Sequence, residues 1–282
     1  MRRPLAALIC AFLTVLSIVA PASAITNGEP DDGRHPYVGV AYTVNAYCSG
    51  SLIAPTVFLT AGHCTDAFEA EGNQVYVTFA EEPLVDPDIT HPWFFPDAND
   101  AITGTPYTHG DFNWDAWPNT ADVGVIILDQ PVTWLGFGSL PELGQLDPLA
   151  TRRGRQDARF TLVGYGVEGM SHAGGELHAT DYSPRRMVSS AKLIGITRNK
   201  NTTGDALIRL SVAPGTGGGT CFGDSGGPTY LGDSDLIVGV NSAIHTRNCK
   251  GSANAFRLDT EVAYAFLCQF EHLGVVLPSG CA

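Results

Sequence analysis

The stretch Cys221-Phe222-Gly223-Asp224-Ser225-Gly226-Gly227-Pro228 surrounds one serine with glycines and places an acid directly before it. Glycine lets the backbone bend tightly and lets a bound carbonyl group approach closely. The backbone N–H groups of Gly223 and Ser225 can then point at one negatively charged oxygen. The stretch is therefore typical of a loop that carries a nucleophilic serine.

A serine hydroxyl is a weak nucleophile and needs a neighbouring base. His63 lies far upstream in Thr60-Ala61-Gly62-His63-Cys64, and Asp122 starts an apolar run that ends at Leu128. The chain order is therefore histidine, aspartate, serine. Taken together, the three motifs resemble those of the chymotrypsin-like (trypsin-type, family S1) serine peptidases.

The resemblance covers residues 25–273 and implies an all-β fold of two packed six-stranded antiparallel barrels with a C-terminal α-helix. The active site of such a fold lies in the seam between the barrels, and the frequent turns of this sequence are compatible with it. We expect a single peptidase domain at 25–282, divided into a first barrel at about 25–130, a second at about 131–258 and the helix at about 259–273.

The resemblance also implies a role for each motif residue. Ser225 attacks the scissile carbonyl, His63 transfers the proton, and Asp122 orients His63. The N–H groups of Gly223 and Ser225 form the oxyanion hole. These roles predict a serine endopeptidase that works through an acyl-enzyme intermediate.

Two other functions are considered. Gly223-x-Ser225-x-Gly227 also matches the nucleophile elbow of α/β-hydrolase esterases, but Gly226-Gly227-Pro228 opposes the helix that must follow such an elbow. That reading would also need its histidine after the serine, at His245 or His272, and neither lies in a matching motif. The second alternative is a catalytically silent, peptidase-like binding protein, although none of the three triad residues is missing.

The N-terminus has the pattern of a secretory signal peptide over residues 1–24. Arg2 and Arg3 precede an apolar run at 5–20, and Ala22-Ser23-Ala24 forms a small-x-small cleavage site. We therefore expect a secreted, extracellular protein without stable membrane association after cleavage. The net charge of −13 argues against nucleic acid and anionic membranes as partners.

Cysteine usage agrees with an extracellular location. One of the seven cysteines, Cys10, lies in the apolar run, and six remain, which suggests three disulfides. The sequence contains no Cys-x-x-Cys pair, which is the spacing that would suggest a zinc site. Position in the family implies bridges Cys48–Cys64 and Cys221–Cys249, and the two cysteines that remain give Cys268–Cys281.

No cofactor or metal is expected. The acids Glu69, Glu71, Glu81 and Glu82 lack the spacing of a calcium motif and are interpreted as a solvated face. The expected partners are protein or peptide substrates, and the expected state is a monomer.

Residues 80–120 carry six prolines and three tryptophans, Trp93, Trp114 and Trp117. We interpret this stretch as a loop-like insertion on the rim of the cleft. A role in substrate contact and a role as a surface loop are equally compatible with the sequence.

The resemblance places the base of the specificity pocket six residues before the nucleophile, at Gly219, where there is no acid. Ser242 and Ile244 lie on one wall, Asn254 on the other, and the neutral Thr220 lies beside the base. A substrate cation would be buried there without a partner, which costs several kcal/mol. The sequence predicts a neutral residue before the scissile bond, with aliphatic side chains favoured.

The resemblance also implies an activation pair, in which the amine of Ile25 pairs with the Asp224 carboxylate. Ala22-Ser23-Ala24 directly precedes Ile25, so no separate activation peptide is expected. At the other end, Asp259 is predicted to cap the C-terminal helix and Gly274 to end it.

Overall fold

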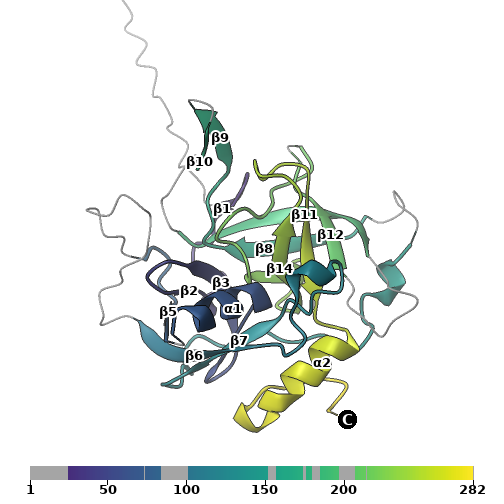
Figure 1. The fold of residues 1–282 in the computed structure, drawn as a ribbon. Coiled ribbons are helices and arrows are strands. Elements are labelled where there is room, and N and C mark those ends of the chain that lie inside the picture. The colour runs from purple at the N-terminus through teal and green to yellow at the C-terminus, as the bar shows by residue number, and fades with distance from the viewer. Residues whose placement is uncertain are drawn as a thin grey trace, which may run out of the picture.

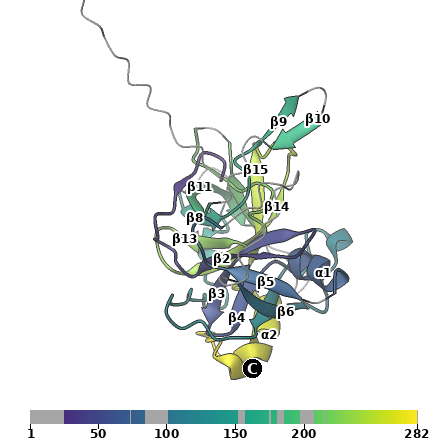
Figure 2. The same ribbon diagram turned by 90° about the vertical axis from the view of Figure 1, so that its left-hand side faces the viewer.

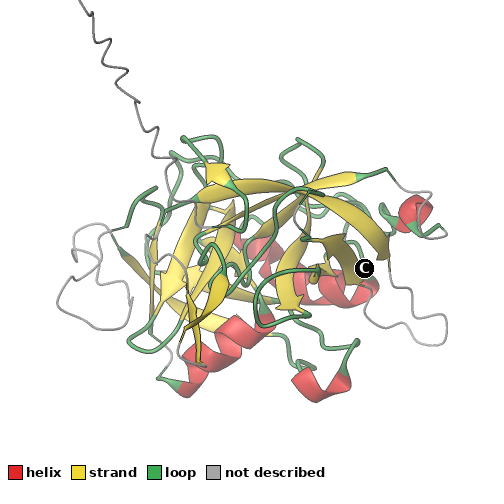
Figure 3. Ribbon diagram, turned by 90° about the horizontal axis from the view of Figure 1, so that it is seen from above, coloured by secondary structure: helices red, strands yellow, loops and turns green. Residues whose placement is uncertain are grey.

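The structure is a computed structural model that describes residues 25–72, 74–83, 101–151, 157–173, 176–179, 185–196, 207–213 and 215–281. Strands make up most of the regular structure, and the helices lie at its periphery (Figure 3). The expected signal peptide at 1–24 and Trp93 lie outside the described residues.

The first barrel is closed and antiparallel, with the strand order β2-β3-β4-β7-β6-β5 (Figure 1). Fully buried apolar side chains such as Val40, Leu52, Phe58 and Ile126 fill it. Gly50 makes room for this core, because a Cβ atom there would lie 2.2 Å from the ring of Phe58. The strands are β2 (Val38–Tyr42), β3 (Tyr47–Ala54), β4 (Val57–Thr60), β5 (Val75–Thr78), β6 (Ile102–Thr108) and β7 (Gly124–Leu128).

The second barrel has the strand order β11-β12-β15-β14-β13-β8 and is closed by pairing of β11 with β8. A further short strand, β1 (Glu29–Pro30), pairs with β11 and attaches the N-terminal segment to this barrel. Its core contains Phe160, Leu162, Ile208 and Val238. The strands are β8 (Arg159–Gly164), β11 (Met187–Ile196), β12 (Leu207–Ser211), β13 (Pro228–Leu231), β14 (Ile237–Ile244) and β15 (Ser252–Arg257).

The remaining elements lie on the periphery of the two barrels (Figure 2). A hairpin projects from the second barrel, and one α-helix follows β4 directly. Among the described residues, no helix is long and apolar enough to cross a membrane. These elements are β9 (Met170–Ala173), β10 (Glu176–Ala179), α1 (Gly62–Ala70), α2 (Glu261–Leu267) and the 3-10 helices η1 (Trp114–Ala116), η2 (Asp147–Leu149) and η3 (Cys268–Leu273).

The C-terminal helix, α2 continued by η3, packs on the first barrel although it follows the second in sequence. Phe266 contacts the ring of His109 at 5.2 Å between centroids, and Phe270 contacts Tyr107 at 6.2 Å. Gly274 ends the helix in a left-handed conformation, as predicted. The helix thus covers part of the first barrel's core.

The predicted cap of this helix was wrong by one residue. The Thr260 hydroxyl accepts the hydrogen bond from the Ala263 N–H and caps α2. The Asp259 carboxylate is already engaged, because it accepts hydrogen bonds from the Arg257 guanidinium and the Leu146 N–H.

The interpretation of residues 80–120 as a loop was also partly wrong, because β6 lies within it. Proline is tolerated in this strand since pairing with β5 ends at Gly104, which leaves one edge free at Pro106. The loop that remains in the described part of this stretch runs over 109–119 and contains η1.

Two barrels, their antiparallel strands and the C-terminal helix confirm the predicted fold class. The α/β-hydrolase alternative is wrong, because Ser225 lies in a loop between β12 and the antiparallel strand β13 rather than at a strand–helix elbow. The structure pairs the cysteines as expected, in Cys48–Cys64 and Cys221–Cys249, which the resemblance implied, and in Cys268–Cys281, which remained.

Candidate active site

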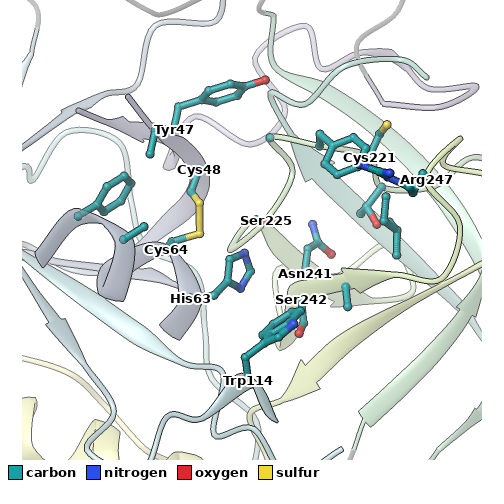
Figure 4. Close-up of a pocket in the computed structure, with 18 of the residues that line it drawn as sticks. Tyr47, Cys48, His63, Cys64, Trp114, Cys221, Ser225, Asn241, Ser242 and Arg247 are labelled. Atoms are coloured by element: carbon teal, nitrogen blue, oxygen red, sulfur yellow. A yellow bond between two sulfur atoms is a disulfide. The ribbon is translucent and has the colours of Figure 1, made fainter. Parts of the chain in front are cut away.

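A cleft of about 650 Å³ lies where the two barrels meet. His63 and Trp114 of the first half of the chain line it together with Ser225, Ser242 and Arg247 of the second half (Figure 4). The structure therefore brings the predicted base and the predicted nucleophile to one solvent-accessible site, from opposite sides of the seam.

His63 lies in the first turn of α1, directly after β4, and Asp122 lies just before β7, which pairs with β4. The Asp122 carboxylate accepts the Nδ1–H of His63, at 3.0 Å from each oxygen, and the His63 backbone N–H at 2.8 Å. The side-chain bond fixes the proton on Nδ1. The Nε2 atom of His63 is then free to act as a base.

Asp122 is fully buried and is held as a carboxylate. Ser242 donates its hydroxyl to Asp122 Oδ2 at 2.6 Å. Burial alone would raise the pKa of Asp122, but the charge and hydrogen bonds of His63, with the bond from Ser242, outweigh burial and leave the pKa below its usual value. The buried anion can thus stabilise a protonated His63.

Hydrogen bonds to the loop around Ser225 fix the orientation of the backbone N–H groups of Gly223 and Ser225. The Phe222 carbonyl accepts from the Val167 N–H at 2.9 Å, and the Asp224 carbonyl accepts from the Gly227 N–H at 3.0 Å. Because C=O and N–H point in opposite directions across a trans peptide, these bonds set the directions of the Gly223 and Ser225 N–H groups. Neither group has an acceptor within the described residues, so both remain available to a ligand oxygen.

Gly223 is required at its position in this loop. Its φ of +96° is in the left-handed region, and a Cβ atom there would lie 2.4 Å from the ring of Tyr47. Any other residue would both strain the backbone and displace Tyr47. The sequence therefore fixes the loop conformation locally.

Asp224 is fully buried beneath the loop. Its carboxylate accepts hydrogen bonds from the Gly166 and Cys221 N–H groups, each at 2.8 Å. Burial raises the pKa of Asp224 to about 7, because these two bonds only partly offset the lost hydration. A nearby cation would lower that pKa again.

The segment that begins at Ile25 is anchored in the second barrel. Ile25 is fully buried and packs with Met187. Thr26 and Gly219 exchange two backbone hydrogen bonds, at 2.9 and 3.0 Å. The segment that begins at Ile25 therefore lies next to Gly219, the predicted base of the specificity pocket.

The five predicted pocket residues do not all reach the cleft. Thr220, Ser242 and Ile244 line it, whereas Gly219 and Asn254 are not among its lining residues. Gly219 packs against Val212, and a Cβ atom at Gly219 would lie 2.0 Å from the Val212 side chain. Asn254 bonds instead to His245 Nε2 at 2.6 Å.

The sequence did not place the aromatic side chains that border the cleft. Trp114 lies edge-on to His63 at 5.3 Å, and Trp117 bridges Trp114 and His245 at 6.1 and 6.4 Å. The three tryptophans within residues 80–120 were the feature of the sequence that could have indicated an aromatic border of the cleft. Trp114 lines the cleft, which favours substrate contact for this part of the insertion.

One grouping of metal-type donors occurs among the described residues, formed by Cys48, His63 and Cys64. The two cysteines are bonded to each other, so neither offers the thiolate that binds a metal ion. The grouping is therefore better explained as a disulfide beside a catalytic-type histidine.

Comparison with known proteins adds independent evidence. The trypsin family model matches residues 25–265. Serine protease 1 of Drosophila melanogaster is 30% identical over 238 residues, which cover 82% of this chain and 79% of that protein.

Solved structures agree on the fold. The HL collagenase structure covers 90% of this chain and 100% of its own, with a TM-score of 0.63 and 21% identity. A mutant of human heparin binding protein (CAP37) covers 92% of this chain and 99% of its own, with a TM-score of 0.56 and 16% identity. Similarity at these identities shows the fold alone.

Proposed function

The chain belongs to the trypsin family of serine peptidases, and on that premise we propose that it is a secreted endopeptidase with His63, Asp122 and Ser225 as its catalytic triad. The observation that carries the proposal is the hydrogen bond of the buried Asp122 to His63, which lines one cleft together with Ser225 from the other side of the seam. The family membership supports protein or peptide substrates.

In the proposed reaction, the Ser225 hydroxyl adds to the scissile carbonyl while His63 Nε2 takes its proton. The Gly223 and Ser225 N–H groups donate to the oxyanion of the tetrahedral intermediate. His63 then protonates the leaving amine, which produces the acyl-enzyme. Water, activated by His63 in the same way, releases the acid product.

The proposed mature chain begins at Ile25, after removal of residues 1–24 as a signal peptide. Its new α-ammonium group would pair with the buried Asp224 carboxylate and thereby stabilise the loop that carries the two oxyanion donors. Support comes from the burial of Ile25 and from the two backbone bonds that anchor Thr26. One cut would then serve both export and activation.

A neutral P1 preference is part of the proposal. The residues that line the described cleft include no acid, and Arg247 adds a positive charge to it. Gly219, the predicted base of the pocket, does not line the cleft and carries no acid. An arginine or lysine of the substrate would therefore meet no counter-charge there.

For matched peptides that differ only at P1, we expect leucine to give a kcat/KM at least about tenfold higher than arginine, because an unpaired buried cation is costly. The Arg247→Gln variant should reduce this ratio by removing a like charge. Cleavage of a peptide series, followed by mass spectrometry, measures both values. Faster cleavage after arginine by the parent enzyme would contradict the proposed preference.

Labelling with a fluorophosphonate probe tests the enzymatic function itself. Such probes react with an activated serine, so the folded protein should be labelled and Ser225→Ala should not. The alternative, a catalytically silent binding protein, predicts no labelling of either protein. Circular dichroism on both proteins separates loss of the nucleophile from loss of the fold.

A further inference from the structure

We propose that Ser49 is a positioning residue for the oxyanion hole, an inference that rests on the proposed function. Ser49 lies in β3 of the first barrel, next to Cys48, and is fully buried. Its backbone N–H donates to the Ser225 carbonyl at 2.8 Å, and its hydroxyl donates to the Gly223 carbonyl at 2.8 Å. One residue therefore holds the carbonyls of both proposed oxyanion-hole residues.

The orientation of the Gly223 carbonyl controls the geometry of the hole. The two donor N–H groups belong to the peptides 222–223 and 224–225. The peptide 223–224 is the only link between them, so its orientation sets the angle at which the two N–H groups converge. The Ser49 hydroxyl fixes that linking peptide through the Gly223 carbonyl.

The hydroxyl of Ser49 is itself held in place. It accepts the Tyr165 N–H at 3.0 Å, and the Ser49 carbonyl accepts the Thr60 hydroxyl at 2.9 Å. The residue after Tyr165, Gly166, donates to the Asp224 carboxylate. The same turn therefore supports both Ser49 and the buried acid of the loop.

All three partners of the Ser49 N–H and hydroxyl come from the second barrel, whereas Ser49 and His63 come from the first. Ser49 thus ties the nucleophile loop to the barrel that carries the base. We infer that its hydroxyl acts mainly on the transition state, in which the oxyanion forms, and little on substrate binding.

The Ser49→Ala variant is expected to lower kcat about 10- to 100-fold, with KM changed by less than about twofold, because a small displacement of oxyanion donors costs rate rather than affinity. Binding of a peptidyl trifluoromethyl ketone, which forms a tetrahedral adduct, should weaken by a similar factor. Binding of the corresponding peptide amide, which forms no adduct, should stay unchanged.

Ser51→Ala is the matched control. Ser51 lies in the same strand and is buried, and its hydroxyl has no hydrogen-bond partner among the described residues. This variant removes a buried hydroxyl oxygen without removing a hydrogen bond, so kcat and KM should match those of the parent. If Ser51→Ala lowers kcat as much as Ser49→Ala does, the loss of rate does not depend on the hydrogen bond to the Gly223 carbonyl, and the proposal is wrong.

A second variant covers the case in which Ser49→Ala does not fold. Ser49→Cys keeps a weaker donor of similar shape, and a titration that finds one free thiol shows that the disulfides are intact. Its kcat should fall several-fold at an unchanged KM. An unchanged kcat, or a rise in KM alone, would overturn the proposal for Ser49 while leaving the proposed function standing. A folded parent that neither reacts with the fluorophosphonate probe nor cleaves peptides would overturn both.

Discussion

The Asp122→Asn variant is expected to cleave peptides about ten-thousandfold more slowly than the parent at neutral pH, with a nearly unchanged KM. Asp122 accepts three hydrogen bonds, from the His63 ring, the His63 backbone and Ser242. An amide offers one acceptor oxygen, and its NH₂ group would face His63 Nδ1. The ring would then carry its proton on Nε2, where it cannot accept the proton of Ser225.

Steady-state kinetics on a peptide amide substrate measures this effect. The Ser242→Ala variant is the graded comparison, since it keeps the carboxylate and removes one hydrogen bond. Its kcat should fall by no more than about tenfold. A rate for Asp122→Asn within tenfold of the parent would rule out Asp122 as the residue that orients His63.

A chain that keeps Ala22-Ser23-Ala24 ahead of Ile25 is expected to be about a thousandfold less active than a chain that starts at Ile25. Without a free amine, the buried Asp224 carboxylate has backbone donors but no counter-charge. An uncompensated buried charge costs about 3–5 kcal/mol, and each 1.36 kcal/mol corresponds to a factor of ten in rate. The loop relieves this cost by leaving the conformation that holds the oxyanion donors.

The Asp224 carboxyl also predicts that the stability of the extended chain and that of the chain starting at Ile25 depend differently on pH. In the extended chain the pKa of Asp224 is raised from 3.8 to about 7, so the folded state binds one more proton than the unfolded state between these values. Its free energy of unfolding should therefore fall as pH rises from about 4 to about 7, by on the order of 4 kcal/mol. In the chain that starts at Ile25, pairing with the ammonium group should remove most of this fall.

Both forms can be made as fusions that a specific protease cuts before residue 22 or before Ile25. Urea unfolding across that pH range then compares their stability, and active-site titration compares their activity. The Asp224→Asn substitution should abolish the activity of the Ile25 form, and in the extended form it should remove the fall in stability between about pH 4 and about pH 7. Equal activity of the extended and trimmed chains would refute the proposed pair.

The sequence predicted the fold where short motifs carry strong geometric demands. Gly223 is one example, because its positive φ and its contact with Tyr47 exclude every other residue. The pairing of Cys48 with Cys64 is another, since family position alone implied it. The glycine-rich pattern records the tight local backbone, whereas the disulfide follows from the family resemblance.

Other features depend on contacts between segments far apart in the chain, which local pattern does not record. The strand β6 was missed because Pro106 and the prolines around it favour a loop, and only the strand pairing shows that β5 leaves the edge free at Pro106. The pattern favours Asp259 as a helix cap, and it does not record that the Asp259 carboxylate accepts the N–H of Leu146 from a distant segment. The aromatic contact of Trp114 with His63 likewise arises only in the folded chain.

The helix that covers the first barrel follows the strands of both barrels in the sequence. Phe266, Phe270 and Val275 complete an apolar core whose first strand, β2, begins at Val38. During synthesis the first barrel therefore stays incomplete until this helix has emerged from the ribosome. Because His63 and Asp122 are held by this barrel, a fragment that ends before the helix is expected to lack the proposed active site.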